Sequence, residues 1–119
     1  MLEVIDVPAE NVIGLQLDGK INKQDICKIL SPIRYALECN TTVNIYIEID
    51  TLEGFSLGAL YEEMKMTLPQ IRHFKKEAVV TDQTSLKKWV NLGNTLWWGG
   101  EVKYFSSCDR DKALQWVQN

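Results

Sequence analysis

The stretch VNIYIEID, Val43–Asp50, decides the fold. Its odd-numbered positions hold valine and isoleucine, and its even-numbered positions hold Asn44, Tyr46, Glu48 and Asp50. Successive side chains of a strand point to opposite faces, so this alternation predicts a strand inside a sheet, with its isoleucines covered by helices. We expect the other face to be half solvated. If Glu48 is buried there, its carboxylate needs a partner.

Two shorter strand patterns precede this stretch, at Leu2–Val7 and Asn11–Asp18. The turn-forming residues Pro8–Asn11 link them, and a link this short predicts an antiparallel hairpin. Gly19 is expected to end the second strand.

A helix is predicted between the hairpin and Val43. Asn22 is the expected N-cap, and Asp25 places a carboxylate in the first turn, where the helix dipole favours negative charge. Apolar residues then recur at helical spacing and form one stripe for burial. They are Ile26, Ile29, Leu30, Ile33 and Leu37.

Helices and strands alternate over the rest of the chain. The expected elements are a helix capped by Ser56, a strand at Ala78–Thr81, a helix capped by Thr84 or Ser85, a strand at Glu101–Phe105 and a helix opened by Asp109. The order β-β-α-β-α-β-α-β-α predicts an α/β fold with a mixed five-stranded sheet, parallel except for the N-terminal hairpin. Right-handed crossovers should place successive helices largely on one side.

Composition limits the class of protein. A chain of 119 residues with 45% hydrophobic and 24% charged residues suits one globular domain, residues 1–119. The net charge of −3 disfavours nucleic-acid binding, which depends on Lys and Arg at phosphates. The sequence shows neither a signal peptide nor an apolar run long enough to span a bilayer, so we expect a cytoplasmic protein.

Cofactor motifs are missing. Three cysteines, Cys27, Cys39 and Cys108, without CxxC spacing form neither a disulfide framework nor a zinc site, and we expect reduced, partly buried thiols. Phosphate-loop and dinucleotide motifs are also absent, so we expect no cofactor and no metal.

Four segments resemble the small bacterial SpoIIAA-like proteins of the STAS/CRAL-TRIO-like superfamily. They follow the family's order over nearly the whole chain, and they are Ile47–Lys65, Phe74–Asp82, Gly100–Phe105 and Lys112–Val117. The resemblance implies a SpoIIAA-like (STAS-like) α/β fold. It also implies a regulatory or binding role, since family relatives include anti-sigma-factor antagonists and the STAS domains of anion transporters.

The antagonists carry a phosphorylated serine within an Asp-Ser-Ser-Gly pattern at a helix start. The matching segment here is Phe55-Ser56-Leu57-Gly58. With Gly58 aligned to the motif's glycine, Leu57 occupies the phosphorylated position and Phe55 the aspartate position. The resemblance therefore does not imply a phosphorylation switch of the antagonist kind. CRAL-TRIO relatives hold lipids, but in larger cavities.

The carboxyl edge of the parallel strands is the candidate ligand site, because open α/β sheets bind ligands there. Asp50 and Asp82 end two strands, and Ser56 and Thr84 begin the helices that follow. Free N–H groups at helix starts attract anions. Ordinary capping and turn formation explains the same four residues and is the favoured interpretation.

A Ser-His-Asp hydrolase could be assembled from Ser56, His73 and Asp82. The sequence around Ser56, however, lacks the G-x-S-x-G pattern that a nucleophile elbow needs. His73 lies beside Arg72 and Lys75, where positive charge complements a helix C-terminus. We therefore assign no catalytic residue and expect no enzymatic activity.

Trp97 and Trp98 form the candidate partner surface. Two adjacent rings point in different directions, so one packs in the core while the other is exposed or covered by a neighbour. Exposed aromatics are enriched in interfaces. The sequence thus favours a regulatory or binding module that acts through a protein partner or as a homodimer. A carrier or sensor of a small apolar, lipid or anionic ligand is the alternative, and a small enzyme is third.

Overall fold

The computed structural model describes residues 1–7, 9, 11–20, 22–40, 42–53, 74–82 and 101–118. Its elements are β1 (Leu2–Ile5), β2 (Val12–Lys20), α1 (Lys23–Cys39), β3 (Val43–Glu53), β4 (Phe74–Thr81), β5 (Glu101–Phe105), a short 3-10 turn η2 (Ser107–Asp109) and α4 (Arg110–Gln118). The helices expected from Ser56 and from Thr84 or Ser85 lie outside the described residues.

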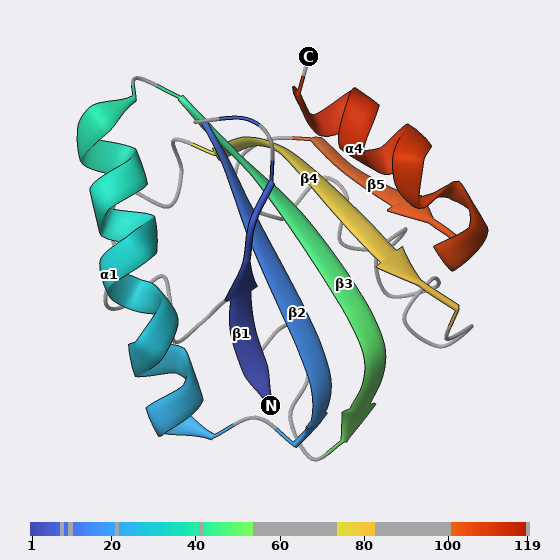
Figure 1. Ribbon diagram of the computed structural model, residues 1–119, viewed down its shortest axis with the longest axis horizontal. Coiled ribbons are helices and arrows are strands. Elements are labelled where there is room, and N and C mark those ends of the chain that lie inside the picture. The colour runs from blue at the N-terminus through green and yellow to red at the C-terminus, as the bar shows by residue number, and fades with distance from the viewer. Residues whose placement is uncertain are drawn as a thin grey trace.

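The five strands form one sheet in the order β1-β2-β3-β4-β5 (Figure 1). β1 pairs with β2 in antiparallel register, and the pairs β2–β3, β3–β4 and β4–β5 are parallel. The predicted mixed sheet, parallel except for the N-terminal hairpin, is therefore confirmed. β3 lies at its centre, as the alternation in Val43–Asp50 indicates.

Gly19 does not end β2, and that prediction is wrong. The strand continues to Lys20, and its register against β3 shifts between Leu17 and Gly19. Gly19 has a φ of 73°, a left-handed conformation that glycine adopts without strain, and such residues are typical of bulges. Its N–H donates a hydrogen bond of 3.1 Å to the Thr51 hydroxyl oxygen on β3, so the irregular backbone remains bonded.

The start of α1 agrees with the prediction. The Asp25 N–H donates to Asn22 Oδ1 at 2.9 Å, and the Asn22 N–H donates to Asp25 Oδ2 at 3.1 Å. This reciprocal capping box satisfies two backbone donors that the first helical turn would otherwise leave free. The cap fixes where the apolar stripe of α1 begins.

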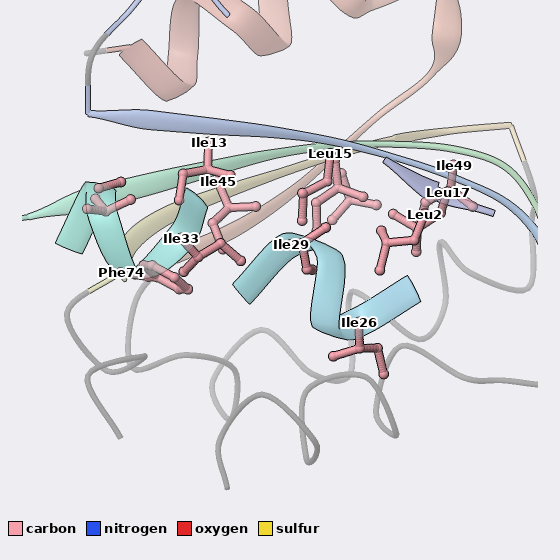
Figure 2. Packing of buried hydrophobic residues seen from close by; sticks show 14 of the residues in the cluster. Leu2, Ile13, Leu15, Leu17, Ile26, Ile29, Ile33, Ile45, Ile49 and Phe74 are labelled. Atoms are coloured by element: carbon pink, nitrogen blue, oxygen red, sulfur yellow. The ribbon is translucent and has the colours of Figure 1, made fainter. Parts of the chain in front are cut away.

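The larger core lies between α1 and the sheet (Figure 2). Ile26, Ile29 and Ile33 of α1 are buried, while Leu30 and Leu37 pack against the cluster from positions that are only partly buried. The sheet contributes alternate residues of β2 and β3, including the four odd-numbered residues of the stretch 43–49. The prediction that this face is covered by a helix is confirmed.

The opposite face of the sheet is covered by α4, so the expected placement of successive helices on one side is wrong for this helix (Figure 2). Ala113 and Val117 of α4 are fully buried against a second cluster, which includes Val12, Tyr46, Ala78, Val80 and Phe105. Consequently Asn44 and Tyr46 are buried, and the half-solvated face that we expected is covered there. The apolar stripe of α4 requires burial, and because α4 follows β5 and connects no two of the described strands, the handedness of crossovers does not determine the face that it covers.

Candidate functional site

Asp50 and Asp82 line the same hollow, which lies between β3 and β4 at the carboxyl edge of the sheet. The hollow has a volume of about 150 Å³. Both carboxylates are exposed, and β3 extends past Asp50 to Glu53, so Asp50 does not end its strand as expected. The remaining described lining comes from Glu48, Ile49, Val80, Thr81 and Ser107.

Asp82 is bonded to the segment that leads into α4. The Ser107 N–H donates to Asp82 Oδ1 at 3.0 Å, and the Ser107 hydroxyl donates to Asp82 Oδ2. These hydrogen bonds lower the pKa of Asp82, with the hydroxyl as the larger cause, because both favour the ionised carboxylate. A carboxylate with a lowered pKa is a weak general base, so this Ser–Asp pair stabilises structure better than it would activate a nucleophile.

Protonating Asp82 should weaken the attachment of η2 and α4. Because the folded-state pKa is lowered, the stabilisation is present above the unfolded pKa of about 3.9 and is lost as the pH falls through the folded value. Asp82→Asn should therefore lower the melting temperature at neutral pH and reduce its decline in acid. Thermal unfolding from about pH 7 to about pH 3 measures this, with Asp6→Asn, an exposed aspartate after β1, as control. Identical acid profiles for wild type and Asp82→Asn would contradict the expectation.

Glu48 has the partner that its position demands. The Arg110 Nε lies 2.8 Å from Glu48 Oε1, so the first residue of α4 forms an ion pair with the middle of β3. The neighbouring Tyr46 hydroxyl is buried beside Glu48 and Arg110. Burial, reinforced by the Glu48 charge, raises the pKa of Tyr46 to about 12, so the phenol stays neutral.

The carboxyl edge therefore holds α4 in place. Asp82 accepts hydrogen bonds from Ser107, and Glu48 forms an ion pair with Arg110. Asp50 accepts a long hydrogen bond of 3.5 Å from Gln16 Nε2. Three carboxylates surround one hollow, and their negative charge disfavours the binding of an anion there. An anion was the ligand that the predicted helix starts had suggested for this edge. In the part of the chain that the structure covers, no group of three metal-ligating side chains comes together. Ser56, His73 and Thr84 lie outside the described residues, so ligand binding at this edge stays a prediction.

A basic surface cluster, which the sequence did not reveal, lies at the other end of α4. It consists of Lys76 on β4, Lys103 on β5 and Trp116 on α4, and we call it the Lys–Trp cluster. The Lys76 and Lys103 Nζ atoms lie 5.2 and 5.7 Å from the centroid of the Trp116 ring. Lys76 and Lys103 are 27 residues apart in sequence, so only the pairing of β4 with β5 reveals their proximity.

A second hollow, of about 480 Å³, lies at the C-terminal end of α1. Its described lining is Tyr35, Ala36, Cys39 and Asn40. The three cysteines are exposed and free, so the expectation of partly buried thiols is wrong. The candidate partner residues Trp97 and Trp98 lie outside the described residues.

The sheet, the two helices that the structure describes on its faces and the carboxyl edge bonded to α4 define a small α/β domain. The chain belongs to the SpoIIAA-like family, whose model matches residues 12–118. It is also similar in fold to an uncharacterised protein with a SpoIIAA-like fold from Shewanella loihica PV-4. That likeness has a TM-score of 0.71 and 23% sequence identity, and covers 98% of this chain and 92% of the other.

No curated protein matches the chain. Among the helices that the structure describes, none is long and apolar enough to cross a membrane. The suspected family and the fold class are confirmed, and the family's fold supports a binding or regulatory module in general.

Proposed function

We propose that this protein is a non-enzymatic binding or regulatory module that acts through a protein partner or by self-association. The observation that carries the proposal is that carboxylates at the carboxyl edge of the sheet bond to other residues of the same chain. Asp82 and Glu48, which could otherwise act on a ligand, bond to Ser107 and Arg110 and fix α4 to the sheet. The remaining hollow of about 150 Å³ is smaller than the roughly 300 Å³ that ligand pockets usually offer.

The protein's surface chemistry supports a macromolecular partner. The Lys–Trp cluster combines positive charge with an aromatic ring, and Trp, Tyr and Arg dominate binding hot spots. The exposed, unpaired thiols of Cys27, Cys39 and Cys108 fit a reducing compartment, and we place the protein in the cytoplasm.

Native mass spectrometry of the purified protein tests this function. We expect a homo-oligomer or a complex with another protein, and no bound small molecule at stoichiometric level. A monomer that carries one small molecule per chain would overturn the proposal.

A carrier or sensor of a small ligand is the second candidate. The hollow of about 480 Å³ at the end of α1 favours it, because its volume falls within the usual range for ligand sites. The same measurement distinguishes the two, since a carrier would retain its cargo under gentle ionisation. Cys39→Trp, at an exposed residue of the lining, would then block the hollow and abolish the added mass, while leaving the oligomeric state unchanged.

A further inference from the structure

The Lys–Trp cluster brings two positive charges to one indole ring. Lys76 Nζ lies 5.2 Å and Lys103 Nζ 5.7 Å from the Trp116 centroid, so the two ammonium groups are at most about 11 Å apart. Lys103 Nζ also lies 5.4 Å from the Phe105 centroid. Phe105 and Trp116 are tilted against each other at a centroid distance of 6.0 Å. The Trp116 ring thus contacts both lysines, and the Phe105 ring contacts Lys103.

Neither ammonium is neutralised by a carboxylate of the described residues. Lys76 Nζ donates to the Trp116 carbonyl oxygen at 3.3 Å, a dipole near the C-terminus of α4 rather than a full charge. Lys103 is exposed, and its ammonium contacts the two rings. The pair is therefore a local excess of positive charge on a chain whose net charge is −3.

The ring contacts also restrain the two side chains. A free lysine loses more rotamer entropy than most side chains when a partner immobilises it. Here cation–π contacts already restrict both lysine side chains, and the hydrogen bond to the Trp116 carbonyl further restricts Lys76. Binding of an anion therefore costs less additional side-chain entropy. A carboxylate between the two ammonium groups would in addition relieve their mutual repulsion.

We propose that the Lys–Trp cluster binds a carboxylate-rich segment of a partner protein, with acidic side chains at alternate positions of that segment on the two lysines. This inference rests on the proposed function and names the chemistry of the partner. Alternate residues of an extended segment point to the same side about 6.5–7 Å apart, which is compatible with two ammonium groups at most about 11 Å apart.

The extent of the positive surface favours a peptide over a membrane. Among the described residues the cluster holds two lysines. Glu101, which is exposed, is the register partner of Lys76 and lies two residues from Lys103 on the same face of the sheet. Anionic membrane surfaces attract broader basic patches of several Lys or Arg residues. A narrow pair of cations bordered by a carboxylate suits discrete carboxylates better than a continuous negative surface.

Fluorescence anisotropy with a labelled peptide of alternating glutamate and leucine tests the proposal, with the glutamine–leucine peptide as the uncharged probe. The full chain should bind the glutamate peptide at least about tenfold more tightly than the glutamine peptide. Lys103→Gln should reduce binding by a similar factor, and Lys103→Arg should restore it. Lys112→Gln is the matched control, because Lys112 lies on α4 and already pairs with Asp109 at 3.7 Å.

Equal affinity for the two peptides, or a Lys103→Gln variant that binds like wild type, would overturn the inference. Binding to phosphatidylserine vesicles without binding to the glutamate peptide would overturn it in favour of a membrane surface. Circular dichroism confirms that each variant is folded. If the peptide fails while native mass spectrometry shows a protein complex, the inference is rejected and the proposed function stands.

Discussion

Glu77→Gln should raise the free energy of unfolding at neutral pH, because it replaces a buried ionisable carboxyl group with a neutral amide. Glu77 lies on β4 and is only 1% exposed. Its register neighbours are Ile45 on β3 and Val102 on β5, both of which belong to the larger core. Neither carboxylate oxygen has a hydrogen-bond partner among the described residues. Burial raises the pKa of Glu77 well above its usual range, because the apolar surroundings penalise the ionised form.

The sign of the pH dependence follows from this raised pKa. The unfolded chain loses the Glu77 proton near the ordinary glutamate pKa, whereas the folded chain keeps it until the pH reaches the raised value. Between those two values the folded state binds more protons, so this group makes the free energy of unfolding fall by up to about 1.4 kcal/mol per pH unit. Glutamine has nothing to protonate, and the variant should avoid this loss.

Denaturant unfolding between about pH 5 and about pH 8 measures the effect. We expect Glu77→Gln to exceed wild type by at least about 1 kcal/mol at pH 7, with a difference that grows as the pH rises. Glu101→Gln is the matched control, because Glu101 is an exposed glutamate on the adjacent strand and should change stability by less than about 0.5 kcal/mol. A Glu77→Gln variant less stable than wild type throughout this range would contradict the expectation.

Asn44→Ala should destabilise the protein by about 2–4 kcal/mol. The Asn44 amide is buried under α4 and joins three elements. Its Nδ2 donates to the Val117 carbonyl oxygen of α4 at 2.6 Å, and its Oδ1 accepts from the Lys76 N–H of β4 at 3.1 Å. Alanine would leave one buried donor and one carbonyl unsatisfied, at about 1–3 kcal/mol each, although part of this is recovered if water enters.

Urea unfolding followed by circular dichroism measures the loss. Gln16→Ala is the control, since Gln16 also bears an amide at a strand position of the sheet but makes a long 3.5 Å contact with the exposed Asp50. It should cost less than about 0.5 kcal/mol. A loss below about 1 kcal/mol for Asn44→Ala would show that the amide does not connect α4 to the sheet.

The sheet was predictable because the sequence patterns that define its elements involve residues that are close together in the chain. Alternation in Val43–Asp50 and helical spacing from Ile26 to Leu37 each determine which residues are buried, and the capping pair at the start of α1 marks where the helix begins. The start of β4 was not predictable, because Lys75, Lys76 and Glu77 are polar. Glu77 is nevertheless buried, and the strand begins at Phe74 instead of Ala78.

The position of α4 could not be predicted for a different reason. Its apolar stripe, Ala113 and Val117, shows that one side of the helix is buried but does not show against which face of the sheet. The same limit applies to the site. Topology alone brings Asp50 to the same edge as Asp82, whereas the roles of Ser107 and Arg110 depend on where α4 docks.

The contact between Asn44 and α4 spans 73 residues of sequence, and it has a consequence for biosynthesis. On the ribosome, β3 emerges long before the helix that covers its second face, so Tyr46 and Ala78 stay uncovered until α4 has been translated. Closure of the fold thus becomes a late event, and contacts so distant along the chain slow it further. A nascent chain stalled shortly before Arg110 would expose an apolar, aggregation-prone face, the kind of surface that chaperones recognise.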